Sequence, residues 1–389
     1  MTRSRMPTIE EESDEGRTSA AWEGDGNAPP AAVEDTMDQL RVMLRRESDA
    51  YLPCDDYLYK TALSSSASSN DAVCEAWRRK LCEWCYSVVD HFNFDREVVS
   101  YAISFLDRTV AAKSKSEGVC SLPQRQFQLL AVSSLYLAIK IHAEVDADTP
   151  RRKLRIGAYV ELSRGYFSEA VIEATELDIL TTLNYRVNPP TSLSFVALML
   201  RLCPKWTNET SIPASSYSRV MGALFDVARY LTELSICLSS FTFNSKTSVT
   251  AYASIIYAMD HLSHSSLSLP PHVRSLFLNA LYESLALTPL DPEVQAVYQK
   301  LDEVCPDLFQ AHPLHLPDEE SSSLVDGKVS PVCVADVPVA RSSTEQQKPG
   351  MAQEDVRSPR KRSRSFDERD SSSRGSNKME ACSKHHNHA

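Results

Sequence analysis

Apolar residues recur at helical spacing through the middle of the chain. Between residues 72 and 184 they fall at i, i+3, i+4 and i+7, and no alternating run of useful strand length interrupts them. This pattern predicts five helices, near residues 77–92, 95–110, 127–140, 154–162 and 168–183. Asp95 and Ser168 stand at the starts of the second and fifth helix, where their side chains suit a helix N-cap.

The third predicted helix is apolar or small-sided around nearly its whole circumference. Such a helix is expected to be surrounded by other helices. Pro123 precedes it, where a first helical turn tolerates proline. Lys140 ends it, where a cation suits the helix C-terminus. The stretch is too short, and its flanks are too polar, for a membrane span. Taken alone, Lys140 would be interpreted as a solvated charge at a helix end.

A second helical block follows from residue 192 to about residue 304. Its stretch Ala251–Asp260 weakly echoes Ala131–Lys140, with Ala, Ser and Ala in register, which indicates two copies of one helical unit. Pro189 and Pro190 end the first block, because the residue before a proline is pushed out of the α region. The predicted fold class is all-α, with tandem five-helix domains at residues 72–188 and 191–304.

The two ends of the chain are expected to be disordered. Residues 1–35 are acidic, rich in Ser, Gly and Pro, and without hydrophobic period. Residues 36–71 are expected to hold a short amphipathic helix, followed by a serine-rich linker at residues 64–69. Residues 313–389 are rich in Ser, Pro and acids and contain the basic run Arg357–Arg364. Such a run is typical of a nuclear import signal, or of a solvating tail.

Net charge and cysteine usage argue against several classes of function. The net charge of −11 argues against a dominant surface for nucleic acid or for an anionic membrane. The 10 cysteines form no disulfide framework and no signal peptide is present, so we expect a reducing, intracellular environment. Cys82 and Cys85 form a single CxxC inside a helical pattern, which favours core thiols over a zinc or redox site. The histidines at 385, 386 and 388 lie in the tail and are weak support for a metal.

No catalytic constellation stands out in the helical blocks. They contain no nucleophile–base pairing, no phosphate-cradling Gly loop and no metal-ligand cluster, and glycine totals only 10. We therefore expect no cofactor, no metal and no enzymatic activity. A helical enzyme is the less favoured alternative, for which a perturbed carboxylate or histidine in a closed apolar pocket would be required.

Four segments, in order along the chain, resemble motifs of the cyclin family. They are Trp77–Trp84 (like Met-Arg-Ala-Ile-Leu-x-x-Trp), Leu106-Asp107-Arg108 (Leu-Asp-Arg), Leu137–Lys140 (Ala-Ala-Lys) and Glu176–Tyr185 followed by Pro189-Pro190-Thr191 (Glu-x-x-x-Leu-x-x-Leu and Pro-Thr). The resemblance covers roughly residues 72–304, firmly in the first block and loosely in the second. Residues 37–57 are similar to the helix that precedes the cyclin box in plant D-type cyclins. The resemblance implies two cyclin boxes.

The resemblance implies a structural ion pair between Arg78 and Asp107, joining the first two helices of the box. A buried pair of this kind specifies register more than it stabilises. The alternative is that the two residues are independent surface charges, since Arg and Asp are mostly exposed.

The resemblance also implies that Lys140 and Glu176 bind a cyclin-dependent Ser/Thr kinase, around its mobile C-helix. Apolar neighbours would cover the kinase helix: Leu137, Ile141, Leu177, Leu180 and Tyr185. The chain would then be an allosteric activator in cell-cycle control, with no catalytic group of its own. For Glu176 the alternative is an ordinary charge on a helix surface.

In several cyclins an exposed groove on the first helix binds Arg-x-Leu substrate or inhibitor peptides. The matching residues here are Trp77, Leu81, Trp84 and Gln128. The alternative is that both tryptophans belong to the core. This chain departs from the family at Lys80, which replaces an apolar residue, and at Ser87, which stands where the groove has an acid.

Other family features are less complete. Leu52–Asp56 is a near miss to the Leu-x-Cys-x-Glu that binds retinoblastoma proteins. Ser358 precedes Pro359 and basic residues, as in a substrate of proline-directed kinases, and we expect a nuclear protein that shuttles with the cytoplasm. A transcription-type cyclin, or a cyclin-like scaffold that activates no kinase, is the alternative within the same fold.

Overall fold

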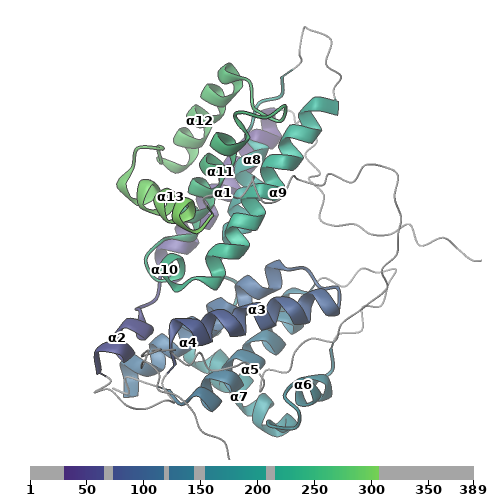
Figure 1. Ribbon diagram of the computed structural model, residues 1–389, viewed down its shortest axis with the longest axis vertical. Helices are drawn as coiled ribbons and strands as arrows, with labels where there is room; N and C mark the ends of the chain where they lie inside the picture. The colour runs from purple at the N-terminus through teal and green to yellow at the C-terminus, as the bar shows by residue number, and fades with distance from the viewer. Residues whose placement is uncertain (1–29, 65–72, 118–121, 144–153, 207–214, 306–389) are drawn as a thin grey trace, which may run out of the picture. The chain divides into compact units, whose positions relative to one another are not determined.

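The computed structural model describes residues 30–64, 73–117, 122–143, 154–206 and 215–305, and every element in these ranges is a helix (Figure 1). The predicted all-α class is confirmed. We define the first helix group as α3 (Glu75–His91), α4 (Glu97–Glu117), α5 (Gln124–His142), α6 (Ile156–Leu162) and α7 (Glu169–Thr182). The second helix group is α8 (Ser192–Arg201), α9 (Ser215–Cys237), α10 (Ser239–Thr242), α11 (Thr247–Leu262), α12 (Pro271–Leu285) and α13 (Pro292–Val304).

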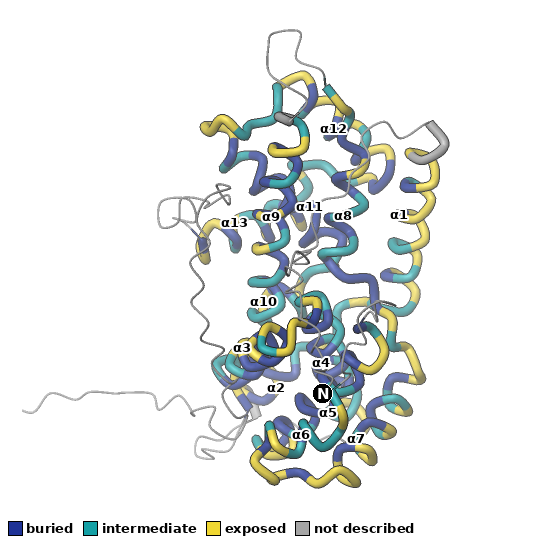
Figure 2. The backbone as a smooth tube through the Cα atoms, turned by 90° about the vertical axis from the view of Figure 1, so that its right-hand side faces the viewer, coloured by how far each residue is buried: buried dark blue, intermediate teal, exposed yellow. Residues whose placement is uncertain are grey.

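Helix α5 is the centre of the first group. It packs against α3, α4, α6 and α7, and its side chains from Phe127 to Ile139 are almost all buried. The buried positions run around the helix rather than along one stripe, which is why the sequence is apolar on every side. Its first turn follows Pro123, and Lys140 is the first exposed residue after the buried stretch. Figure 2 colours the chain by how far each residue is buried, with buried positions in dark blue and exposed positions in yellow.

Helix α11 is the corresponding centre of the second group. It packs against α8, α9 and α13, and every residue from Ser248 to Met259 is buried. Asp260 at its end forms an ion pair with Arg274 of α12, with Oδ1 and Nη2 2.6 Å apart. The buried apolar side chains of the described residues form two separate clusters, one for each helix group. The division into tandem domains at residues 72–188 and 191–304 stays a prediction.

The N-terminal helix begins earlier than the sequence predicts. Helix α1 spans Pro30–Ala50, so the expectation of disorder up to residue 35 is wrong for residues 30–35. It packs on α8 and α12 of the second group, with Leu40 fully buried. The chain then crosses to the first group, where the unpredicted helix α2 (Tyr57–Ser64) contacts α4. The apolar face of α1, although it precedes the first group in sequence, therefore packs on the second group.

Two of the predicted helix starts differ in their capping. Asp95 accepts a hydrogen bond from the backbone N of Glu97 at 2.8 Å, as its position predicts. Ser168 occupies the N-cap of α7, but its side chain makes no capping hydrogen bond, so that part of the expectation is wrong.

Several sequence-based predictions lie outside the described residues. They are the disorder of residues 1–29 and 313–389, the serine-rich linker at 65–69, the basic run Arg357–Arg364, Ser358, and the histidines at 385, 386 and 388.

Candidate functional site

A buried ion pair joins α3 to α4. Arg78 is fully buried, and its Nε and Nη2 lie 3.0 and 2.7 Å from the two carboxylate oxygens of Asp107, a bidentate contact. Tyr57 of α2 donates a further hydrogen bond to Asp107 at 2.9 Å. Burial by itself lowers the pKa of Arg78, but the charge and hydrogen bonds of Asp107 raise it overall. The guanidinium is therefore held in its charged form. Because both side chains are buried, the alternative of two independent surface charges is excluded.

The same arginine also links the two helix groups. Its Nη1 donates to the backbone oxygen of Ile236 in α9 at 3.0 Å, and its Nη2 donates to Thr242 in α10 at 3.2 Å. Its guanidinium carbon lies 5.6 Å from the centre of the Phe243 ring. Nearly every donor of the buried side chain thus has a partner, which a buried charge requires. Arg78 acts as a structural tie between the groups.

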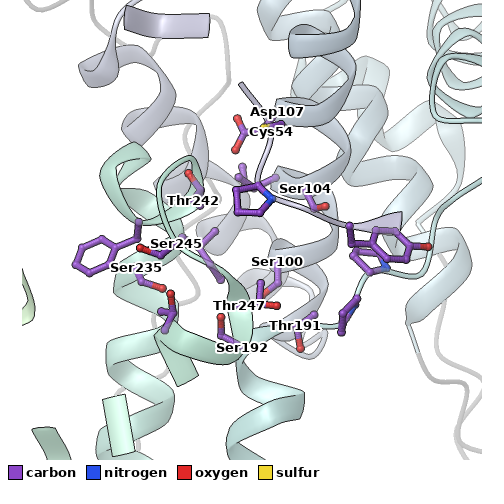
Figure 3. Close-up of a pocket in the computed structure, with 18 of the residues that line it drawn as sticks. Cys54, Ser100, Ser104, Asp107, Thr191, Ser192, Ser235, Thr242, Ser245 and Thr247 are labelled. Atoms are coloured by element: carbon purple, nitrogen blue, oxygen red, sulfur yellow. The ribbon is translucent and has the colours of Figure 1, made fainter. Parts of the chain in front are cut away.

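A cavity of about 120 Å³ lies beside Asp107, which is one of its lining residues. Figure 3 shows hydroxyl side chains around it from both groups, among them Ser100, Ser104, Thr191 and Thr247. The segment after α1 closes another side, where burial raises the pKa of the Cys54 thiol. The cavity at this junction is therefore lined by hydroxyl and apolar side chains, and its charged lining residues are Asp107 and Arg108.

A second ion pair lies on the surface, where the end of α5 meets α7. Lys140 Nζ is 2.7 Å from Glu176 Oε1. The lysine side chain is 52% exposed and the glutamate side chain 11%. The hydrogen bond to Glu176 raises the pKa of Lys140. An ion pair with one such exposed partner contributes only about 0–1 kcal/mol to stability, so folding alone gives little reason for it.

Exposed apolar side chains surround this surface pair. Ile141 is 43% exposed, Leu177 56% and Tyr185 63%, while Leu180 is half-buried. We call these four residues, with Lys140 and Glu176, the α5–α7 surface. Large apolar side chains gathered at one place on a surface mark interaction sites more often than scattered ones do.

Leu137 was expected on the same surface, and that expectation is wrong. Its side chain is 1% exposed, because α5 at this position faces the core of the first group. The spacing explains the difference: Lys140 and Ile141 come after the last buried turn of α5, whereas Leu137 belongs to it.

The backbone after α7 holds Tyr185 outward in an unusual conformation. Asn184 and Tyr185 both have left-handed backbone angles, with φ of 50° and 58°. This region is uncommon for a bulky residue and costs of order 1–3 kcal/mol. The Tyr185 N–H donates to Leu180 O at 2.8 Å, which satisfies an otherwise unpaired carbonyl at the helix end. Strain of this kind is often retained at functional sites.

The sequence prediction missed two residues next to this surface. The Tyr136 ring lies one helical turn before Lys140, with its centre 5.5 Å from Nζ. Asp178 of α7 pairs with Lys113 of α4 at 2.7 Å. The i, i+4 spacing of Tyr136 and Lys140 was a readable signal, whereas the Lys113–Asp178 contact depends on how α4 and α7 pack and was not.

Comparison with known protein families identifies the fold of the first group. Residues 40–188 match the family described as the cyclin N-terminal domain. This stretch of the chain is therefore similar to the cyclin family. The match covers the buried Arg78–Asp107 pair and the whole α5–α7 surface.

Individual cyclins show the same relationship at low identity. G1/S-specific cyclin-E of Hemicentrotus pulcherrimus is 28% identical over 135 residues, which cover 35% of this chain and 29% of that protein. Cyclin-D3-2 of Arabidopsis thaliana is 29% identical over 138 residues, 35% of each chain. G2/mitotic-specific cyclin-B1 of Caenorhabditis elegans is 25% identical over 239 residues, 59% of this chain and 61% of that protein. The aligned segments thus span less than two thirds of each of these relatives.

Among solved structures, a viral cyclin from herpesvirus saimiri is 11% identical, with a TM-score of 0.45. It covers 72% of this chain and 99% of its own.

The expectation of a peptide-docking groove on α3 needs correction. Trp77, Leu81, Trp84 and Gln128 are all buried, none more than 9% exposed. Helix α3 packs against α4, α5 and α9, and this face of the helix is enclosed by them. The four residues therefore line no exposed groove in this structure, and the alternative interpretation as core holds.

Cys82 and Cys85 of the CxxC are buried in the same cluster. None of the helices in the described ranges has the length and apolar composition needed to cross a bilayer.

Proposed function

We propose that this chain is a cyclin, a regulatory subunit that binds a cyclin-dependent Ser/Thr protein kinase and activates it in cell-cycle control. The observation that carries the proposal is the Lys140–Glu176 pair, which lies on the surface among exposed apolar side chains. By the resemblance of their motifs, we infer that these two residues correspond to the lysine and glutamate with which the family contacts its kinase.

The chemistry of the α5–α7 surface suits a helix of a partner. Lys140 offers N–H donors and Glu176 offers carboxylate oxygens, which are the groups needed to bond the unpaired backbone atoms at helix ends. Leu177 and Tyr185 offer the apolar area. In the free chain the two charges bond each other. Because a pair with one exposed partner contributes little stability, exchanging the Lys140–Glu176 bond for bonds to a partner costs little.

The activation mechanism follows from the way protein kinases work. A Lys–Glu pair inside the kinase must form before the ATP phosphates are positioned, and that glutamate lies on the kinase's mobile C-helix. A partner that binds the inward position of the helix more tightly than the outward one shifts the equilibrium towards the active kinase. The cyclin would supply differential binding energy and no catalytic group.

The test is a pull-down of cyclin-dependent kinases by the purified full chain, with kinase activity assayed in the eluate. We expect the wild type to retain an active kinase and Lys140→Ala/Glu176→Ala to lose at least tenfold in affinity, a typical loss for an interface anchor. The matched control is Asp260→Ala/Arg274→Ala. It removes a partly exposed ion pair at the end of α11, where Asp260 stands at the position that corresponds to Lys140 in α5. This control should leave kinase binding unchanged.

Each outcome decides between the alternatives. Binding without kinase activity would favour the scaffold interpretation. Equal loss in both double variants would mean that the loss reflects stability rather than contact. Retention of the kinase by Lys140→Ala/Glu176→Ala would refute the proposed contact surface. If the kinase complex phosphorylates the tail of the largest polymerase subunit rather than cell-cycle substrates, a transcription-type cyclin would be favoured.

We also propose that the complex acts in the nucleus, on the basis of the basic run Arg357–Arg364. Deleting the run from a fluorescently labelled full chain should move it to the cytoplasm. An unchanged nuclear signal would refute the role of the run.

A further inference from the structure

Two cysteines from different helix groups face each other. Cys82 lies on α3, and Cys237 is the last residue of α9. Their sulfur atoms are 3.3 Å apart, although the residues are 155 positions apart in sequence. The CxxC pattern drew attention to Cys82 and Cys85, but the nearby partner of Cys82 is this third, distant cysteine.

The two thiols have different surroundings. Cys82 is completely buried, whereas Cys237 is half-buried. Burial raises the pKa of Cys82 well above its ordinary value. The pKa of Cys237 is lowered, first because of its hydrogen bond with the Cys82 thiol, and also because the positive charge of Arg78 lies nearby; burial opposes both. The more accessible sulfur is thus also the more readily ionised, which is the combination that favours oxidation.

We propose that Cys237 is a site of oxidation by peroxide and that Cys82 resolves the product, forming a disulfide that joins α3 to α9. This inference does not depend on the kinase proposal.

The reaction needs one peroxide as the oxidant. The Cys237 thiolate attacks a peroxide oxygen, so that an S–O bond forms, the O–O bond breaks, and the protonated leaving oxygen departs as water. Cys237 is then a sulfenic acid. Cys82 sulfur attacks Cys237 sulfur, the S–S bond forms, the S–O bond breaks, and the proton of the Cys82 thiol leaves with the hydroxide as water. Two thiols and one hydrogen peroxide give one disulfide and two waters.

The geometry requires only a small approach of the two sulfurs, from 3.3 Å to the bonded distance of about 2.0 Å. The bond would form next to the tie made by Arg78, which already holds the oxygen of Ile236, the neighbour of Cys237. Oxidation would therefore add a covalent link where the two groups are already held by hydrogen bonds. We expect it to restrain the junction rather than to rearrange it.

The experiment treats the reduced, folded full chain with hydrogen peroxide, blocks the remaining thiols with iodoacetamide, and maps the tryptic peptides without reduction. Trypsin cuts after Lys80, Arg96, Arg229 and Lys246, so the disulfide should join peptide 81–96 to peptide 230–246. Dithiothreitol should separate the two. Since peptide 81–96 contains both Cys82 and Cys85, the Cys85→Ser variant identifies the linked sulfur: it should still form the crosslink.

Three further measurements complete the test. Cys237→Ser should abolish the crosslink, and Cys203→Ser, at a buried cysteine of the second group, should not. Oxidised wild type should unfold at a higher temperature than reduced wild type, and this shift should vanish in Cys237→Ser. If Cys237→Ser does not fold, the tryptic peptide maps of wild type and Cys85→Ser decide whether Cys82 and Cys237 form the disulfide.

The proposal is overturned by any of three results. Cys237 could stop at a sulfenic acid that dimedone traps without any link to Cys82. The link could run to Cys85 instead. The crosslink could form only after the chain has been unfolded in urea, which would show that the folded chain does not present the pair.

Discussion

Glu47 of α1 bonds Ser248 at the first turn of α11, 201 positions further along the chain. The backbone N and the hydroxyl of Ser248 donate to the two carboxylate oxygens at 2.9 and 2.6 Å, and Glu47 is 1% exposed. A carboxylate at this place satisfies N–H groups that have no partner within the helix and interacts favourably with the helix dipole. Glu47 therefore anchors the N-terminal helix on the second group.

Replacing this carboxylate should weaken the fold. Glu47→Gln keeps the size but removes the charge and one acceptor, which leaves a buried donor of α11 poorly satisfied. We expect the free energy of unfolding in urea to fall by about 1–3 kcal/mol. Asp49→Asn, at an exposed position of the same helix, is the control and should change it by less than about 0.5 kcal/mol. Equal effects of the two substitutions would contradict the anchoring role.

Breaking the buried pair should cost more than any surface change. Asp107→Asn leaves the Arg78 charge buried without its counter-ion, and we expect a loss of about 3–5 kcal/mol in the free energy of unfolding. The comparison is Asp38→Asn, which breaks the exposed pair with Arg41 and should cost about 0–1 kcal/mol.

The double substitution Arg78→Met/Asp107→Leu separates charge from packing. If the cost of Asp107→Asn comes from the unpaired charge, the double variant should be more stable than the single one in the same urea titration. A double variant that is less stable would mean instead that the hydrogen bonds to Ile236 and Thr242 matter most.

Tyr185→Gly tests whether the strained turn after α7 is kept for binding. Glycine adopts positive φ without steric cost, so we expect the free energy of unfolding to stay within about 1 kcal/mol of the wild type. Loss of the exposed ring should weaken kinase binding by about thirtyfold or more, as for an interface hot spot. Isothermal titration of the kinase measures the second effect. A strongly destabilised variant with unchanged kinase affinity would show that the ring is structural.

His142 should make stability depend on pH. Burial lowers its pKa, its ring stacks on Tyr101 at 3.7 Å, and its Nε2 lies 2.7 Å from the oxygen of Val187. The unfolded imidazole therefore takes up its proton at a higher pH than the folded one. This contribution to stability is complete above about pH 6.5 and is lost as the pH falls below it.

Urea unfolding between pH 8 and pH 5 measures the slope. His142→Gln should flatten the decline below about pH 6.5, and His272→Gln, at an exposed histidine of α12, should keep it. A decline that is unchanged in His142→Gln would assign it to other groups.

Local sequence patterns were enough to predict the helices but not their partners. The uninterrupted apolar circumference of α5 predicted a helix enclosed by others, because burial on all sides leaves no polar stripe to read. The apolar pattern could not predict that α1 packs on the second group, because an apolar face does not specify which other helices it contacts. Helix α2, with eight residues, was too short to produce a period that could be recognised.

The candidate site shows the same limit. Lys140 and Glu176 came from motif resemblance, and the structure adds that they bond each other in the free chain. Exposure could not be inferred from residue type: Leu137 and Leu177 are both leucines, yet one is buried and the other is 56% exposed. The tryptophans of α3 were open to two interpretations for the same reason. The proximity of Cys82 and Cys237 depends wholly on how α3 packs against α9.

The N-terminal helix has a consequence for how this chain can be divided. The family match starts at residue 40, inside α1, and ends at residue 188, before the helices on which α1 packs. A recombinant piece with those ends would keep half of a helix and leave the apolar side of Leu40 facing water. The segment that is similar in sequence, residues 40–188, is therefore shorter than the segment that packs together. To keep every described packing partner, a recombinant piece has to run from residue 30 to residue 305.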